Sequence, residues 1–205
     1  MEKPVLILSA VEREQKYIKE KSFSKNVIFK TVGIGPIEAA INSALLISDL
    51  KPKSVYFLGS AGFYSETYLS IGDVALGHIY HFGDLGQVQN HSYIPEIMNL
   101  PIETSTFCLT EKFSFKVKNC SVVTVPSITK NDELSLKIKA FFKAEIEHLE
   151  AYSIAKICSD VQIPFFSIFG LSNEVGIHSH EQWLKNQDLA LEHASDVLGK
   201  IISGD

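Results

Sequence analysis

Arginine is almost absent from this sequence of 205 residues, in which Arg13 is the only one. Because the planar guanidinium is the usual bidentate ligand of phosphate, a phosphate site built from several arginines is excluded. The net charge of −5 gives no broad basic surface either, which argues against a nucleic-acid partner. We therefore expect no nucleic-acid partner.

Cysteine is also scarce, since Cys108, Cys120 and Cys158 are the only ones and no two are spaced as Cys-x-x-Cys. Scattered thiols in an odd number are typical of reduced cysteines in a cytosolic protein. The segment 1–10 lacks the length and the cleavage site of a signal peptide. No apolar run reaches the roughly eighteen residues that span a membrane. These absences predict a cytoplasmic protein without membrane association.

Short apolar runs alternate with helix-favouring stretches along the chain. We expect strands over 5–9, 27–32, 54–58, 73–81, 121–125 and 164–171. We expect helices over 12–21, 36–50, 131–142, 150–159 and 182–202, and loops with short elements over 84–112. The helix at 36–50 is the clearest, with Pro36 in its first turn and a broad apolar face that includes Ile37, Ile41 and Leu45.

Continuous apolar strands that alternate with helices are typical of an α/β fold. No linker or repeat divides the sequence. We therefore predict one domain over 1–205, with a mixed, mostly parallel β-sheet flanked by helices. In such folds, ligands bind where strands end and loops begin. The loops to search for a site are those that follow Ala10, Val32, Leu58, Val125 and Leu171.

Two segments rich in small residues follow predicted strands. Gly33-Ile34-Gly35 has Glu38 where a dinucleotide fingerprint needs a third glycine, which argues against a Rossmann-type reductase. The segment 59–62, Gly-Ser-Ala-Gly, allows a ligand to approach backbone N–H groups, but it is not the nucleophile elbow of serine hydrolases. Taken alone, each pattern fits a packed turn as well as a ligand site.

Three polar residues stand where a site is expected. Glu14 follows the first strand, Glu150 begins a helix, and Asn173 ends the most buried strand. Each has an ordinary structural alternative: a solvated glutamate at a helix start, a helix cap and a turn asparagine. Asn173 is the strongest candidate, because a polar group at the end of a buried strand must reach solvent or find partners.

Two histidine pairs, His78 with His81 and His178 with His180, have spacings that suggest a metal site. No cysteine or acidic cluster accompanies them to complete a tetrahedral set of ligands. We therefore expect no metal.

In this order, the segments resemble the nucleoside phosphorylase/nucleosidase superfamily. Ala-Val-Glu-Arg-Glu at 10–14 is similar to the first loop of methylthioadenosine/S-adenosylhomocysteine nucleosidases, and Glu-His-Leu-Glu-Ala at 147–151 is similar to the ribose-binding signature. The resemblance implies that Glu14 activates water and that Glu150 binds the ribose hydroxyls, with Leu149 in place of a methionine under the ribose. It also implies substrate contacts from the small-residue loop, through Ser60, Ala61 and Gly62.

Ser172-Asn173 directs the resemblance toward one branch of this superfamily. Nucleosidases for adenine nucleosides carry aspartate after this serine, whereas Ser-Asn-x-Val-Gly followed by a tryptophan, here Trp183, resembles the futalosine hydrolases. Asp84-Leu85-Gly86 resembles another loop of that family, while His178 stands where the family has arginine. An asparagine amide supplies donors for O6 and N7 of a 6-oxopurine, and an ionised aspartate supplies none.

The resemblance therefore implies an N-ribosyl hydrolase that releases hypoxanthine from futalosine in menaquinone biosynthesis, without a cofactor and as a homodimer. Glu14 and Asn173 would be catalytic, and Ser172 and Asp84 would contact the substrate. The alternatives are a methylthioadenosine/S-adenosylhomocysteine or aminodeoxyfutalosine nucleosidase and a purine nucleoside phosphorylase. A nucleotide-binding module without activity is another alternative, although it would be expected to lack Glu14.

Overall fold

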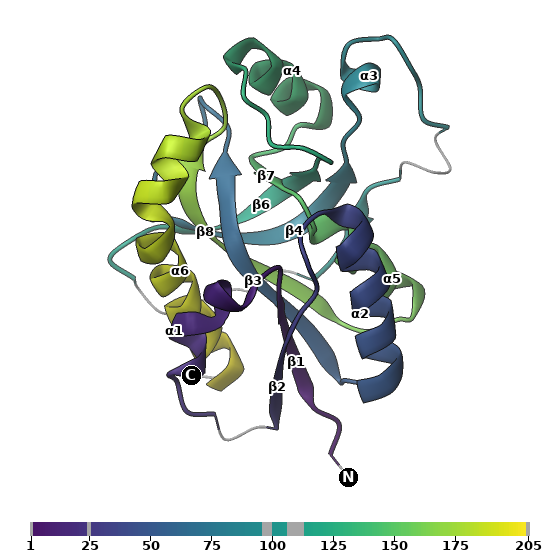
Figure 1. Cartoon of the computed structure of the whole chain (residues 1–205), viewed down its shortest axis with the longest axis vertical. Coiled ribbons are helices and arrows are strands. Elements are labelled where there is room, and N and C mark those ends of the chain that lie inside the picture. Colours follow the sequence, from purple (N-terminus) through teal and green to yellow (C-terminus); the bar gives the residue numbers. More distant parts are fainter. Residues whose placement is uncertain (1, 24–25, 96–99, 106–112, 204–205) are drawn as a thin grey trace.

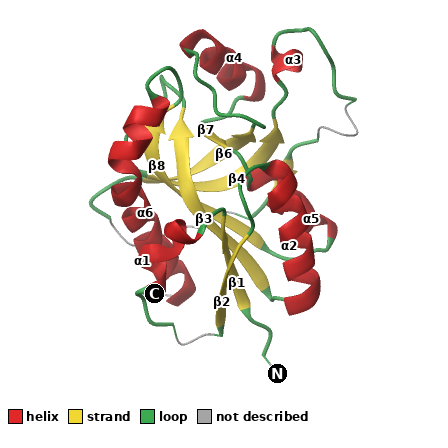
Figure 2. Cartoon of the chain, viewed as in Figure 1, coloured by secondary structure: helices red, strands yellow, loops and turns green. Residues whose placement is uncertain are grey.

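The structure is a computed structural model that describes residues 2–23, 26–95, 100–105 and 113–203. It contains one eight-stranded sheet with helices packed around it (Figures 1 and 2). The strands are β1 (Val5–Ser9), β2 (Val27–Thr31), β3 (Ser54–Phe63), β4 (Val74–Phe82), β5 (Ile102–Glu103), β6 (Val117–Thr124), β7 (Ile146–His148) and β8 (Phe165–Glu174).

Five of these strands form a closed circuit of hydrogen-bonded neighbours. Strand β3 pairs with β7, β7 with β6, β6 with β4, β4 with β8, and β8 pairs back with β3. Strands β1 and β2 extend the sheet from β3, and β5 pairs with β4. The centre of the molecule is therefore a small barrel with a two-stranded extension.

The sheet is mixed, as predicted, but the expectation that it is mostly parallel is wrong. Strand β7 runs antiparallel to β3, β8 runs antiparallel to β4, and β5 runs antiparallel to β4. The connection 64–73 between β3 and β4 contains no helix. A parallel return needs a longer crossover, so a connection of this kind favours reversal of the chain direction.

Helices cover the sheet on two sides (Figure 1). On one side α2 packs on α5, and on the other the long α6 packs on β8 and β3, with α1 beside it. The helical elements are the 3₁₀ helix η1 (Glu12–Gln15) and the α-helices α1 (Lys16–Lys19), α2 (Pro36–Leu50), α3 (Leu85–Val88), α4 (Asp132–Phe142), α5 (Ala151–Asp160) and α6 (Ser179–Ser203). Within the described ranges, no helix has the length and apolarity to cross a membrane.

Helix α6 lies directly against β8 at Gly170. A Cβ on Gly170 would lie 1.9 Å from the backbone oxygen of Ala190, so only glycine fits between the strand and the helix. Gly199, which lies in α6 itself, is different. A Cβ on Gly199 would meet the flexible side chain of Lys21 at 2.7 Å. The contact at Gly170 fixes the distance between α6 and the sheet.

Helix α2 does not bury the apolar face that its sequence suggested. Its buried residues are Ala39, Ser43 and Ile47, whereas Ile37, Ile41 and Leu45 are 73%, 54% and 64% exposed. The small residues Ala39 and Ser43 allow close packing on the sheet and on α5, and the larger residues form an outward apolar stripe. A continuous apolar stripe on a protein surface is typical of an interaction surface.

Several predicted boundaries differ from the structure. Segment 59–62 was expected to be a turn, but it belongs to β3, and Ser172-Asn173 belongs to β8. The expected helix over 12–21 is a 3₁₀ turn followed by the short α1. Strand β7 was not expected. In 84–112, the structure has α3 and β5, and part of that range lies outside the described residues.

Candidate active site

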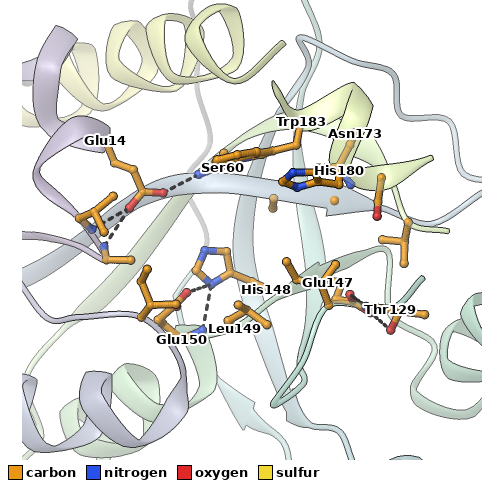
Figure 3. A pocket seen from close by; sticks show the side chains of 18 residues that line it. Glu14, Ser60, Thr129, Glu147, His148, Leu149, Glu150, Asn173, His180 and Trp183 are labelled. Atoms are coloured by element: carbon orange, nitrogen blue, oxygen red, sulfur yellow. Dashed lines mark hydrogen bonds and ion pairs between the residues drawn. The ribbon is translucent and has the colours of Figure 1, made fainter. Parts of the chain in front are cut away.

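The candidate site is a cavity of about 330 Å³ at the ends of β1, β3, β7 and β8 (Figure 3). The loop after β1, the turn before α2, the segment around Thr129 and the start of α6 complete its walls. The cavity is lined by most of the predicted site residues: Glu14, Ser60, Ala61, Gly62, Leu149, Glu150 and Asn173. Residues that lie far apart in the sequence therefore meet at one place.

Glu14 is held by the backbone at the start of η1. Its Oε2 accepts from the N–H groups of Ala10 at 2.9 Å and Val11 at 3.3 Å, and its Oε1 accepts from the N–H of Ser60 at 3.2 Å. Burial raises the pKa of the Glu14 carboxyl to about 7, against the opposing effect of these hydrogen bonds. A fixed carboxylate with a pKa near neutrality is suited to accept a proton from water.

Glu150 enters the cavity from the start of α5. Its Oε1 accepts from the N–H of Gly35 at 2.7 Å, and its Oε2 lies 3.1 Å from Nδ1 of His148. It occupies the N-cap position of α5 but forms no side-chain cap hydrogen bond, so the helix-cap alternative does not explain its buried carboxyl. Burial is the main cause that raises the pKa of Glu150 to about 7, and the nearby Glu14 adds to it.

Gly59 in β3 has no side chain, and this leaves space for a carboxyl oxygen from η1 and a histidine nitrogen from β7. A Cβ on Gly59 would lie 3.2 Å from both Oε1 of Glu14 and Nε2 of His148. These two polar atoms therefore approach the same point on the surface of β3. A side chain at this position would separate the cavity carboxylate from the histidine.

The amide of Asn173 has a defined orientation. Its Oδ1 accepts from the Ser172 hydroxyl at 2.9 Å, and its Nδ2 donates to the Glu174 carbonyl at 3.1 Å. A carbonyl oxygen can only accept, so the NH₂ group must lie on that side of the amide. One N–H of Nδ2 is used there, and the second has no hydrogen-bond partner among the residues that the structure describes.

Glu147 also lines the cavity but is engaged with the protein. Its Oε1 accepts from the N–H of Thr129 at 3.0 Å, and its Oε2 accepts from the hydroxyls of Thr129 at 2.7 Å and Tyr64 at 2.9 Å. Burial raises the pKa of its carboxyl. Glu147 thus fixes the segment around Thr129 against β3 and β7.

The side of the cavity formed by α6 is aromatic. Trp183 donates from Nε1 to the Ser60 hydroxyl at 3.2 Å, and the ring of His180 stacks on Trp183 with centroids 5.7 Å apart. Ile34 and Ile128, both exposed, contribute apolar surface to the cavity lining. The cavity therefore combines an aromatic wall, apolar edges and a group of buried carboxyls.

Two predicted substrate-binding residues do not line the cavity. Ser172 is fully buried behind Asn173, with its hydroxyl also 3.3 Å from the Ala61 carbonyl. Asp84 is the N-cap of α3, where it accepts from the N–H of Gln87 at 2.7 Å and from the hydroxyl of Ser92 at 2.8 Å. The structure thus gives Ser172 a role in orienting Asn173 and gives Asp84 a role in capping a helix.

The four histidines that were considered as metal ligands have different surroundings in the structure. His78 contacts the Cys120 carbonyl at 3.0 Å, His81 packs on Phe142, and His178 is exposed. Of these four histidines, His180 lines the cavity. Sequence reasoning missed His148, which occupies the variable position of the ribose-binding signature and carried no signal of its own.

Comparison with known proteins identifies the family. A family model described as the phosphorylase superfamily matches residues 9–203. The chain belongs to the phosphorylase superfamily. This is a family of enzymes, so the prediction of an enzyme is confirmed. A relative from Geobacillus sp. (strain WCH70), a 5′-methylthioadenosine/S-adenosylhomocysteine nucleosidase, is 27% identical over 99% of this chain and 95% of its own length.

Solved structures of two nucleoside-cleaving enzymes have the same fold. The 5′-methylthioadenosine/S-adenosylhomocysteine nucleosidase of Neisseria meningitidis has a TM-score of 0.84 at 19% identity, covering 99% of this chain and 100% of its own. The futalosine hydrolase of Helicobacter pylori strain 26695 also has a TM-score of 0.84, at 17% identity, covering 99% and 98%. Equal similarity to both means that the fold does not select a substrate, and the side chains must.

Proposed function

We propose that this protein hydrolyses the N-ribosidic bond of a 6-oxopurine nucleoside, and that its substrate is futalosine, from which it releases hypoxanthine. The observation that carries the proposal is the Asn173 amide, which lines the cavity with a free N–H donor. O6 and N7 of hypoxanthine are adjacent acceptors, and an N–H donor matches that edge. The nucleosidase names of the relatives support the reaction class.

The buried carboxyls support cleavage of a ribosyl bond. Such cleavage passes through an oxocarbenium-like state, which needs negative charge near the sugar and a water molecule delivered to the anomeric carbon. In our proposal, Glu150 accepts hydrogen bonds from the ribose hydroxyls and Glu14 removes a proton from water. The Asn173 N–H then stabilises the purine as it gains electron density.

The cavity favours water over phosphate as the nucleophile. None of the cavity-lining side chains in the described part of the chain is lysine or arginine. Arg13 is 55% exposed at its side chain and pairs with Asp188 at 3.3 Å, so it is engaged on the surface. A phosphate ion would approach several carboxyls without a cation to balance its charge, and we therefore propose hydrolysis rather than phosphorolysis.

A second candidate is a nucleosidase for 5′-methylthioadenosine or S-adenosylhomocysteine. The names of the relatives favour it, and so does the lining of the cavity, which among the residues described offers no lysine or arginine to the acidic tail of futalosine. His148 is enclosed, so His180 at the aromatic wall is the residue we assign to the tail. In our proposal, the N–H of Asn173 donates to O6 of the oxopurine, a position where an adenine nucleoside presents a donor instead of an acceptor, and this contact favours futalosine.

The substitution Asn173→Asp tests the proposed substrate. We expect wild-type protein to prefer futalosine over aminodeoxyfutalosine, two substrates that share one tail and differ in the purine edge. The variant should reverse or flatten this preference by one to three orders of magnitude in relative kcat/KM, since each mispaired buried group costs about 1–3 kcal/mol. The measurement is base release from both nucleosides, with and without phosphate.

Asn131→Asp is the matched control for that experiment. Asn131 caps α4 by accepting from the N–H of Leu134 at 2.8 Å, and aspartate caps a helix equally well. This variant should keep the wild-type preference. If Asn173→Asp lowers activity on both substrates by the same factor, the amide only shapes β8 and the choice of futalosine loses its support.

We also propose that the protein is a homodimer whose interface includes α2. The exposed stripe formed by Ile37, Ile41 and Leu45 continues to Ile34, which is 64% exposed and lines the cavity. Burial of four large apolar side chains would stabilise the association. A second subunit on this stripe would lie beside the cavity and could complete its wall around the tail of the substrate.

A further inference from the structure

His148 lies in the cavity wall between the two carboxyls of the proposed mechanism (Figure 3). It is the last residue of β7 and is 6% exposed. The Phe57 ring meets it edge-on with centroids 5.2 Å apart, and the Phe169 ring is 4.5 Å away. A histidine enclosed by aromatic rings in this way is shielded from water, so its ring nitrogens must find partners within the protein.

The hydrogen-bond partners of Nδ1 show which nitrogen of the His148 ring carries the proton. The backbone N–H of Glu150 donates to Nδ1 at 3.2 Å, so this nitrogen acts as an acceptor and the ring proton is on Nε2. Oε2 of Glu150 lies 3.1 Å from the same nitrogen. An ionised oxygen and an accepting nitrogen would repel each other at this distance, whereas a protonated oxygen donates a hydrogen bond.

The groups around Glu150 also favour a protonated carboxyl that donates to His148. Glu14 from η1 and Glu147 from β7 are the acidic groups that share the cavity with Glu150. Glu147 is turned toward Thr129 and Tyr64, while Oε1 of Glu14 approaches the same point on Gly59 as Nε2 of His148. Strands β3 and β8 present the rings of Phe57 and Phe169, and the turn before α2 presents the Gly35 N–H. The lining offers no lysine or arginine among the residues described, so a proton is the available positive charge.

We propose that His148 is a positioning residue that holds Glu150 as a carboxylic acid in the substrate-free enzyme, and that ribose binding releases this proton. In the free enzyme, the Oε2–H of Glu150 donates to Nδ1 of His148, and it shares the single lone pair of that nitrogen with the backbone N–H of Glu150 in a bifurcated hydrogen bond. When the nucleoside binds, the O–H bond of the carboxyl breaks, the proton passes to the buffer, and the carboxylate accepts from the ribose hydroxyls. This inference rests on the proposed function for the ribose contact, but the protonation of the free enzyme does not.

The pKa directions agree with this geometry. Burial raises the pKa of Glu150 to about 7 and lowers the pKa of His148 to about 3. With these values, Glu150 carries the proton and His148 is neutral at slightly acidic pH. Release of the proton on binding then adds a pH dependence to affinity: binding strengthens as the pH rises toward 7, because less work is needed to ionise Glu150.

The first experiment needs no ligand. Infrared spectra of the free protein at pH 6 should show the C=O stretch of a protonated, buried carboxylic acid, and Glu150→Gln should remove one component of that band. His148→Phe removes the acceptor and should shift the pKa of that component downward, while His148→Asn retains an acceptor close to the position of Nδ1 and should preserve it. His81→Phe, outside the cavity, is the control and should leave the band unchanged.

The second experiment counts protons on binding. Formycin B and formycin A are C-nucleosides with an oxopurine-like and an adenine-like edge, and their carbon–carbon ribosyl bond resists hydrolysis. Calorimetric titration at pH 6 in two buffers of different ionisation enthalpy should give release of about 0.9 proton per site from Glu150, as a pKa of about 7 implies. Glu150→Gln should abolish this release, and Glu14→Gln should retain most of it, because burial and not Glu14 is the main cause of the raised pKa of Glu150.

The outcomes separate this inference from the proposed function. A missing Glu150 band in the free protein, or an upward pKa shift in His148→Phe, would show that His148 donates to an ionised carboxylate and would overturn the inference. If His148→Phe does not fold, the wild-type band and its loss in Glu150→Gln still decide the point. Absence of binding by either C-nucleoside, with the Glu150 band present, would instead overturn the ribose contact and with it the proposed function.

Discussion

Glu14 and Glu12 stand two positions apart, yet the fold gives them different surroundings. Glu14 is 9% exposed and accepts three backbone hydrogen bonds, whereas Glu12 pairs with Lys19 on the surface at 3.1 Å. The sequence alone favours a solvated role for both, because glutamates are common at helix starts. The resemblance to nucleosidases selected Glu14 over Glu12. In the structure, Glu14 lines the cavity.

Substitution of Glu14 by glutamine tests its role as a base. We expect kcat to fall by about 100-fold or more, because the amide cannot accept a proton from water. The amide NH₂ will also face one of the backbone N–H donors, which costs about 1–3 kcal/mol of stability. Thermal melting should therefore accompany the kinetics, so that the loss of kcat is measured on folded protein.

Glu12→Gln is the matched control for this loss. It removes an exposed ion pair of the kind that contributes about 1 kcal/mol or less, and both kcat and the melting temperature should stay near wild type. Near-normal turnover in Glu14→Gln would show that another group activates the water.

His148 shows what residue-level reasoning from the sequence could not reach. Its position varies within the ribose-binding signature, and its role depends on Phe57, Phe169 and Gly59, which lie on other strands. The positions of Glu150 and Asn173 in the cavity lining were predictable because their motifs are contiguous. A role that arises from long-range packing leaves no local pattern to find.

At the scale of elements, the strands and helices with strong local patterns were predicted well. Strand β1 and helix α2 have the predicted bounds, because a continuous apolar run and a proline in the first turn are local signals. The extension of β3 through Gly59 was not predicted, because small residues have low strand propensity. The short β7 was not predicted because three residues are too few to show an alternating pattern, and its pairing with β3 and β6 defines it. Tertiary pairing, and not propensity, decides those segments.

Two glycines of the C-terminal half provide an element-level prediction. Gly170→Ala should destabilise the protein by about 3 kcal/mol or more, since its Cβ would overlap the Ala190 carbonyl and push α6 off β8. Gly199→Ala should be neutral or stabilising by up to about 1 kcal/mol, because the Lys21 side chain can move and alanine favours helix.

Chemical denaturation of both glycine variants measures these differences. Activity per folded molecule of Gly170→Ala should fall as well, since displacement of α6 moves Trp183 away from Ser60. Equal stability of the two variants would show that α6 is not fixed by the close contact at Gly170.

At the scale of the whole molecule, the apolar stripe on α2 predicts the oligomeric state. The wild-type protein should elute and scatter light as a dimer, and the double substitution Ile37→Glu with Ile41→Glu should produce monomers, because two buried charges on each side would repel. Since the stripe continues to the cavity through Ile34, we expect the monomer to have a higher KM.

Leu189→Glu with Leu136→Glu is a control that changes exposed leucines of α6 and α4 outside the stripe. It should leave the molar mass unchanged. A dimer that survives the α2 substitutions would place the interface elsewhere.

The closed circuit of strands has a consequence for how the enzyme is made. The circuit is completed by β8, which pairs with both β3 and β4 from near the C-terminal end of the chain and carries Asn173 close to its last residue. A nascent chain on the ribosome holds Glu14 early in synthesis, but neither the Asn173 side of the cavity nor the aromatic wall of α6 exists until the C-terminal segment emerges. We therefore expect a chain that stops before β8 to lack the complete cavity and to leave open strand edges, which are prone to aggregation.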